Sequence, residues 1–154
     1  MWNFKDNSIE VINAFQSVAE EWLEDSSRIL LNQTIQNNRV DTGKTKSSWK
    51  RQVEENKAVI GSTSENAIWE EFGTGHYAIN GDGRKTAWYV PVEGYLGKNK
   101  PTYNGKVVIV HGRGGKDYYK TNGKKPNRPF EHARTTVEPK IQKRLKDLIK
   151  AHIT

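Results

Sequence analysis

One short segment of the sequence has the residue types of a phosphate-binding loop. Residues 41–45 read Asp-Thr-Gly-Lys-Thr, and a glycine followed by lysine and a hydroxyl residue ends the loop that holds nucleotide phosphates. The complete loop also has a glycine five residues earlier and follows a buried strand. Here that earlier position is Asn38, in a polar segment that reads as helix. The sequence therefore argues against a nucleotide site.

Asp41-Thr42-Gly43 is also the catalytic sequence of aspartic proteases, in which two such aspartates share one proton. This chain has a single copy, and Lys44 and Lys46 follow it in place of the apolar flank that such a loop needs. We expect instead that Asp41 and Thr42 cap a turn. Gly43 would supply permissive backbone between a helix and a strand.

Other catalytic and metal-binding patterns are missing from the sequence. The four histidines, His76, His111, His132 and His152, have no i, i+4 spacing, and the chain has neither a cysteine nor a Gly-x-Ser-x-Gly motif. We therefore predict no catalytic residue, no cofactor and no metal site. A small hydrolase is kept only as a third hypothesis.

The composition indicates one domain with a thin core. The chain has 154 residues, of which 34% are apolar and 28% are charged, and this length is ordinary for a single domain. The formal net charge of +7 is unevenly spread: residues 1–38 hold two basic and six acidic residues, whereas residues 84–125 hold ten basic and two acidic ones. This asymmetry indicates either complementary surfaces or a polyanionic neighbour.

The two ends of the chain read as helices. Apolar residues recur at helical spacing over 8–38 and over 127–153, with Ser8 and Asn127 as the expected caps. Pro139 is expected to kink or split the second helix. At the usual rise per residue the first helix is about 45 Å long, so we expect one end to project or to pack on a neighbour.

The middle of the chain reads as strands and a long arm. Residues 47–72 predict two strands followed by a short helix. Residues 73–126 hold eleven of the thirteen glycines and two strand-like runs, 88–92 and 106–110, so we expect a glycine-rich arm. The whole chain, 1–154, is then a single α+β domain, in which a small, mostly antiparallel sheet is packed by the N-terminal and C-terminal helices.

A basic stretch within the arm interleaves lysines with tyrosines. Lysine pairs with phosphate and tyrosine stacks on bases, so a nucleic-acid-binding accessory protein is the second hypothesis. No helix-turn-helix, zinc-finger or ribonucleoprotein motif accompanies the stretch. We interpret it as a candidate inter-subunit arm, made of Lys98, Lys100, Lys106, Arg113, Lys116, Tyr118 and Tyr119.

Four motifs follow one another along the chain. They occupy residues 41–49 (Asp-Thr-Gly-Lys, then Ser-Ser-Trp), 60–62 (Ile-Gly-Ser), 69–75 (Trp-Glu-Glu-Phe-Gly-Thr-Gly) and 123–133 (Gly-Lys-Lys-Pro-Asn-Arg-Pro-Phe, then Ala). In this order, between two long helices, they resemble the gene-product-ten-like family of lambda-like siphophages. Members of that family are head–tail joining, neck or tail-completion minor structural proteins of tailed bacteriophages.

The motif residues are expected to determine fold and assembly. They are Asp41, Thr42, Gly43, Trp49, Glu71, Phe72, Gly73, Thr74, Gly75, Arg128, Pro129 and Phe130. Because three of the aromatic residues stand in otherwise polar segments beside glycine or proline turns, we expect Trp49, Phe72 and Phe130 to be largely buried.

The resemblance implies a structural virion protein without catalytic residues. It implies a ring at the head–tail junction that joins the tail to the capsid, with neighbouring neck, connector and tail proteins as partners and non-specific proximity to DNA. The alternative within this class is a tail terminator that caps the tail tube. Because phage tails are sixfold, the resemblance implies a homo-hexamer rather than a dodecamer.

The same resemblance places the protein in the neck or tail of the virion, after synthesis in the cytoplasm of the bacterial host. The first residues lack the basic and apolar segments of a signal peptide. The apolar runs of the sequence, such as Ile29 to Leu31, are too short to span a membrane. We therefore expect neither a cleaved export signal nor a membrane partner.

Overall fold

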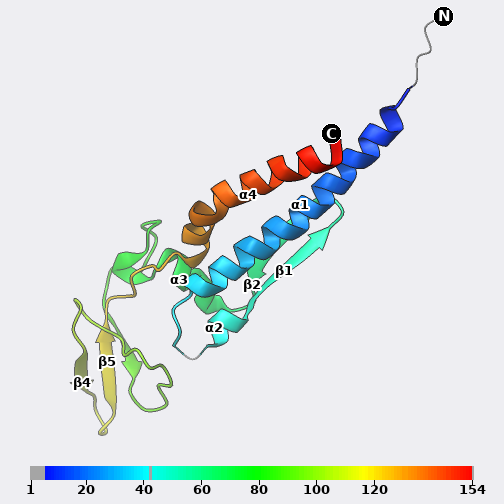
Figure 1. Ribbon diagram of the computed structural model, residues 1–154. Coiled ribbons are helices and arrows are strands. Elements are labelled where there is room, and N and C mark those ends of the chain that lie inside the picture. The colour runs from blue at the N-terminus through cyan, green and yellow to red at the C-terminus, as the bar shows by residue number, and fades with distance from the viewer. Residues whose placement is uncertain (1–5, 42, 154) are drawn as a thin grey trace, which may run out of the picture.

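Two long antiparallel helices form the body of the molecule. The computed structural model describes residues 6–41 and 43–153. Within it α1 (Ser8–Asn37) and α4 (Pro129–Ile153) lie side by side, and the first turns of α1 extend past the end of α4 (Figure 1). Both helices agree with their predicted spans to within two residues, and the projecting end of α1 is as expected.

The seam between these helices is narrow and partly polar. Val18 on α1 is buried, as are Val137 and Leu148 on α4. Further along α1 the buried positions are Ser27 and Thr34, whose hydroxyls donate to carbonyls three and four residues back at 3.1 and 2.8 Å. Because their own helix satisfies these hydroxyls, burying them costs little but adds little apolar area.

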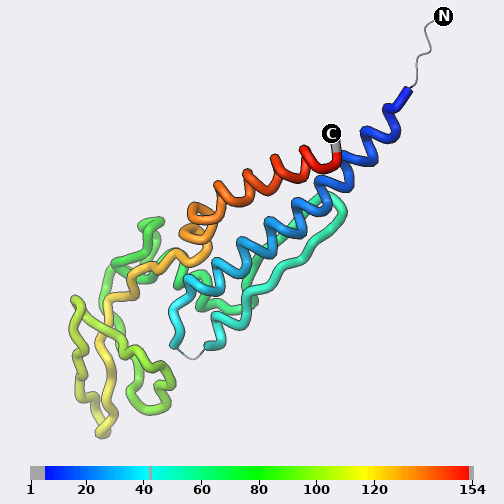
Figure 2. The backbone as a smooth tube through the Cα atoms, in the orientation of Figure 1, coloured from blue at the N-terminus to red at the C-terminus, as the bar shows by residue number. Residues whose placement is uncertain are grey.

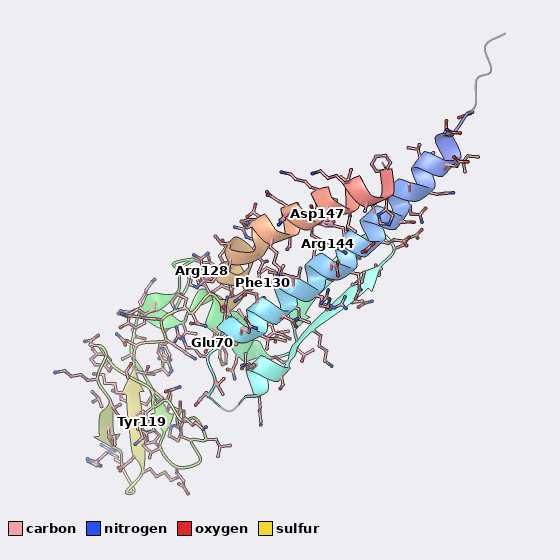
Figure 3. All side chains as sticks on the ribbon, in the orientation of Figure 1. Glu70, Tyr119, Arg128, Phe130, Arg144 and Asp147 are labelled. Atoms are coloured by element: carbon pink, nitrogen blue, oxygen red, sulfur yellow. The ribbon has the colours of Figure 1, made fainter. Side chains whose placement is uncertain are left out.

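Polar contacts between side chains and backbone close the seam further along. The Trp22 indole Nε1 donates a hydrogen bond of 3.1 Å to the Ile141 carbonyl. The guanidinium of Arg144, on α4 (labelled in Figure 3), donates to Asp25 at 2.7 Å and to Glu21 at 2.6 Å, so one arginine of α4 joins two acids of α1. The two helices are thus held together by a few buried apolar side chains and by polar contacts between their side chains and backbone.

A β-hairpin packs on the side of α1. Strands β1 (Trp49–Glu54) and β2 (Lys57–Ser62) pair antiparallel, with Trp49 opposite Ser62 and Glu54 opposite Lys57. Side chains alternate between half-buried and exposed along both strands, as the period of two predicts. Arg51, on the covered face, reaches α1 and pairs with Glu24. The two predicted strands are therefore confirmed.

Short helices connect the hairpin to the rest of the chain. The single-turn helix α2 (Lys44–Ser47) precedes the hairpin, and α3 (Glu65–Phe72) follows it. A 3₁₀ turn, η1 (Gly75–Tyr77), comes directly after α3. The short helix predicted before residue 73 is confirmed as α3.

The glycine-rich arm folds into a second sheet. Strands β3 (Trp88–Pro91), β4 (Val108–His111) and β5 (Asp117–Thr121) form an antiparallel sheet in the order β3-β5-β4. In Figure 2 the chain leaves the helical body after α3, builds this sheet and returns before α4. The α+β class is confirmed, with two small sheets in place of one. The central strand, β5, was missed because its sequence, Asp-Tyr-Tyr-Lys-Thr, has no apolar alternation.

Three predictions about the ends and interiors of helices are corrected. Asn7, not Ser8, occupies the cap position of α1. The side chain of Asn127 donates to the Asn37 carbonyl at 2.8 Å and does not cap α4. Of the two outcomes expected for Pro139, a kink or a split, the split does not occur: α4 continues through Pro139, and Pro139 and Thr135, one turn earlier, are both exposed.

Within the described residues, no helix combines the length and the apolar character that crossing a membrane requires.

The contact of Asp25 with Arg144 between the helices predicts that the stability of the fold depends on pH. Hydrogen bonds from Arg28 and Arg144 lower the pKa of Asp25 from its usual value of 3.8. A lowered folded-state pKa stabilises the fold above the unfolded value, and that contribution is lost as the pH falls through the folded value. We therefore expect Asp25→Asn to reduce the free energy of unfolding at pH 7, with a gap to the wild type that narrows as the pH falls below 3.8.

Urea unfolding at pH 7 and at successively lower pH measures this gap. Asp82→Asn, a change of the same kind in an exposed loop, is the control. A gap for Asp25→Asn that stays constant with pH would contradict the role given to its carboxylate.

Candidate functional site

The four sequence motifs meet at one junction, where the end of α1, the hairpin, α3 and the start of α4 come together. The Trp49 indole stacks on the Phe130 ring with 6.1 Å between centroids and an interplanar angle of 6°. The hydroxyls of Ser48 and Ser62 are 2.6 Å apart. The Asn37 side chain donates to the Pro129 carbonyl at 3.2 Å, which fixes the end of α1 to the start of α4.

Glu71 caps α4 from another element. Pro129 opens α4 and has no N–H, so Phe130 and Glu131 carry the first amides that need acceptors. Both are bound by the Glu71 carboxylate, at 2.9 Å for Phe130 N and 3.1 Å for Glu131 N. A negative charge also lies favourably at the positive end of a helix. The motif residue Glu71 therefore acts as a tertiary cap.

Glu70, beside it, holds the chain that returns from the sheet. Its backbone carbonyl accepts hydrogen bonds from Asn127 N at 2.7 Å and Arg128 N at 3.0 Å. Its buried carboxylate pairs with Lys124 and lies 3.9 Å from the Arg39 guanidinium. Glu70, Arg128 and Phe130 are seen together at the start of α4 in Figure 3. Sequence reasoning placed Glu70 within a motif but did not single it out.

Arg128 enters α4 in an unusual conformation. Its φ of 51° lies in the left-handed region, which non-glycine residues seldom adopt. Pro129 follows and is fully buried, while Phe130 is half-buried against Trp49. Two hydrogen bonds to the Glu70 carbonyl, from Asn127 N and Arg128 N, hold the backbone at this entry to the last helix.

The outgoing and returning chain segments cross at the glycines of the third and fourth motifs. Gly73 ends α3. Thr74 and Lys124 exchange two hydrogen bonds of 3.0 Å, one to a carbonyl and one to the Thr74 hydroxyl. Gly75 and Gly123 both have positive φ, and a Cβ on either would collide with backbone of the opposite segment. The crossing therefore requires glycine at these two positions.

The first motif ties the sheet loop to the body. Asp41 was expected to cap its own turn. Instead its Oδ1 accepts from the backbone N–H groups of Lys98 and Asn99, the latter at 3.2 Å. Gly43 has φ 82° at the start of α2, as predicted for a permissive connection. Thr42 lies outside the described residues.

The prediction for Phe72 is wrong, because 42% of its surface is exposed. The covered face of α3 carries Ala67 and Glu70, and Phe72 lies away from it. Trp49 and Phe130 are only half-buried. All three aromatics line an open apolar cavity of about 270 Å³ that includes residues of all four motifs.

A larger cavity of about 700 Å³ lies between the body and the second sheet. Its walls include Arg39 and Glu70 from the body, and Trp88 and Tyr95 from the sheet side. Burial, followed by the nearby Asp41 carboxylate, raises the pKa of Tyr95. The two acids of this cavity are already engaged, Asp41 with loop amides and Glu70 with Lys124. Over the described residues, no group of three or more His, Asp or Glu side chains is placed to hold a metal ion.

The candidate inter-subunit arm is not one continuous surface. Lys98 and Lys100 lie on the loop after β3, and Lys106 lies just before β4, all exposed. Tyr119 is buried in the sheet, with its ring edge-on to Tyr95 at 5.5 Å. Tyr119 therefore belongs to the core of the sheet and is withdrawn as a contact residue.

The remaining members of the arm lie at the far end of the same sheet. Arg113 and Lys116 are exposed in the turn between β4 and β5, and Tyr118 is half-buried on β5. The structure thus places the loop lysines apart from Arg113 and Lys116 in the turn, and leaves Tyr118 on the strand that follows the turn.

Comparison of the chain with protein-family models, curated proteins and solved structures gave no match.

The cap predicts the effect of changing Glu71. Glu71→Ala leaves the first two amides of α4 without their acceptor, so we expect a loss of about 1 kcal/mol of unfolding free energy, the usual cost of a lost cap. Glu71→Gln keeps one acceptor oxygen and should lose less. Urea unfolding measures both, with Glu55→Ala in the exposed hairpin turn as the control. If Glu71→Ala loses no more unfolding free energy than the control, Glu71 does not cap α4.

The exposures of the aromatics predict an order of stability effects. Phe130→Ala should cost less than the roughly 3–5 kcal/mol of a fully buried phenylalanine, because Phe130 is only half-buried. Phe72→Ala should cost less again. Thermal unfolding of both variants decides the order, and a larger loss for Phe72→Ala would contradict the structure at this site.

Proposed function

We propose that this protein is a structural subunit of a tailed bacteriophage that forms a ring at the head–tail junction and joins the tail to the capsid. The observation that carries the proposal is the convergence of all four family-like motifs on one junction. Trp49 and Phe130 stack, Glu71 caps α4, and Glu70 binds the segment from Lys124 to Arg128. A resemblance confined to scattered turns would have no reason to assemble into a single site.

The chemistry of the site supports a structural role. Its charged groups are engaged in holding elements together: Glu70 with Lys124, Glu71 with the amides of α4, and Asp41 with the sheet loop. The same fold leaves apolar residues exposed on α1 and α3, which is typical of chains that are completed by neighbours. Neighbouring neck, connector and tail proteins are the proposed partners, together with copies of the chain in a hexamer rather than a dodecamer.

The nucleic-acid hypothesis is the second candidate and has weaker support. It required lysines interleaved with stacking tyrosines, but Tyr119 is buried and the loop lysines lie apart from those of the turn. A band-shift assay with duplex DNA tests it directly. Tight binding at physiological salt would favour this candidate, since charge alone gives only weak, salt-sensitive affinity.

Deletion of the gene from the phage genome, with electron microscopy of the lysate, tests the main proposal. A head–tail joining protein predicts DNA-filled heads beside free tails of normal length, and restoration of whole particles by the gene supplied in trans. Tails of irregular, excessive length would instead identify the tail-terminator alternative. Intact, infectious particles from the deletion would contradict both.

A further inference from the structure

The first turns of α1 form an apolar surface that the chain itself does not cover. Residues 8–17 extend past α4 (Figure 1), whose last turn lies beside Glu21, with His152 Nε2 3.9 Å from its carboxylate. Four apolar side chains on these turns are 46–75% exposed: Ile9, Val11, Ile12 and Phe15. Such a face on a helix is normally packed against another element.

This surface continues the packing face of the body. Ile12 and Phe15 are followed at helical spacing by Ala19 and Trp22. The last two line an open cavity of about 480 Å³ beside the hairpin turn, and Trp22 bonds α4. One end of this stripe, at Trp22, therefore contacts the rest of the chain, and the other end, at Ile12 and Phe15, is exposed. We infer that another element covers the exposed end.

The two faces of the second sheet differ in how far they are covered. Register places Trp88, Val90, Ile109, Tyr119 and Thr121 on the inner face. Tyr119 and Thr121 are buried there and Tyr95 packs on Tyr119, whereas Ile109, on the edge strand β4, is 46% exposed. The opposite, outer face carries Tyr89, Pro91, Val108, Val110, Tyr118 and Lys120.

None of the six outer-face residues is buried, and Tyr89 and Pro91 are exposed. In Figure 1 neither long helix lies over this sheet. Stable sheets bury an apolar face under a second layer. The Lys120 ammonium lies over the Tyr103 ring, 4.2 Å from its centroid. The rest of the outer face lacks a second layer, just as the first turns of α1 do.

The charges around the two surfaces are opposite. The outer face holds Lys120 and is bordered by exposed Lys106, Arg113 and Lys116. Asp6, just before α1, and Glu20, in its first half, lie near the apolar stripe. Further along α1, Glu21, Glu24 and Asp25 pair with Arg144, Arg51 and Arg28. Acids on both partners would disfavour the packing of one α1 end on another.

We propose that the first turns of α1 of one copy pack on the outer face of the second sheet of the next copy. The contact joins two different surfaces that lie at opposite ends of the elongated chain (Figure 1). It is therefore head-to-tail, and contacts of this kind close into rings when the rotation between copies permits. The occupant is a second copy of this chain. The inference rests on the proposed function only for the place of such a ring in a virion.

Site-directed disulfides test this contact, because the chain has no cysteine of its own. A chain with Ile12→Cys is mixed, at the highest soluble concentration and under mild oxidation, with a chain carrying Tyr89→Cys or Val110→Cys. These two positions lie on the two edge strands of the outer face. We expect a mixed disulfide with at least one of them, above the yield with Gln142→Cys, an exposed position on α4.

Three outcomes would overturn the proposal. One is a yield with both outer-face positions no higher than with Gln142→Cys. Another is preferential self-linking of Ile12→Cys, which would show an α1–α1 contact. The third is preferential linking to Ile68→Cys, which would place the α1 end in the apolar cavity beside α3.

A matched pair of second changes guards against chance collisions and unfolding. Phe15→Glu, added to the Ile12→Cys chain, should reduce the mixed disulfide to the Gln142→Cys level without changing the helical circular dichroism of the body. Gln142→Glu, added in its place, should leave the yield unchanged. Equal yields with the two would contradict an apolar contact. Failure here, beside a head–tail joining defect in the deleted phage, would reject this contact and keep the proposed function.

Discussion

Two adjacent glutamates at the end of α3 hold the molecule together. Glu70 and Glu71 face different parts of the same returning chain: the first binds Lys124, Asn127 and Arg128, and the second binds the first amides of α4. The core elsewhere is a thin line between α1 and α4. Without this junction the chain that returns from the sheet would enter α4 with unpaired amides and no fixed direction.

This constraint explains why the motifs are spaced as they are. The sheet is inserted between α3 and α4, so its two connections must pass the same point. Thr74 and Lys124 bond across that point, and Gly75 and Gly123 allow the backbones to approach. The buried acid Glu70 is paired with Lys124, which offsets the cost of burying its charge. The sheet is therefore attached to the body at this crossing and, through its loop, at Asp41, which accepts hydrogen bonds from Lys98 N and Asn99 N.

The sequence predicted what local periodicity determines. Apolar spacing located both long helices, the hairpin and α3, because each has a face that packs on a neighbour. It did not locate β5, because the polar and aromatic residues of this central strand do not alternate between apolar and polar. It also misplaced the helix caps. The acceptor for the first amides of α4 comes from Glu71, 59 residues before Phe130, and no local pattern reveals a cap at that separation.

The candidate site was only partly predictable for a related reason. Gly73, Gly75 and the Arg128–Phe130 entry were identified as fold determinants, and they lie at the junction. Phe72 was expected to be buried and is exposed, whereas Tyr119 was expected to contact another subunit and is buried. Burial depends on which face of an element meets the rest of the chain. Phe72 lies on the uncovered side of α3, whereas Tyr119 lies on the covered face of a sheet that the sequence did not reveal.

The dependence of the fold on the paired glutamates is tested most directly by residue-resolved hydrogen exchange on a variant with both Glu70→Ala and Glu71→Ala. We expect the amides of residues 124–131 and of β5 to lose protection together, while those between α1 and α4 around Val18 and Leu148 keep it. Unchanged protection over 124–131, or an equal loss along the whole chain, would contradict the claim that this junction positions the sheet and the last helix.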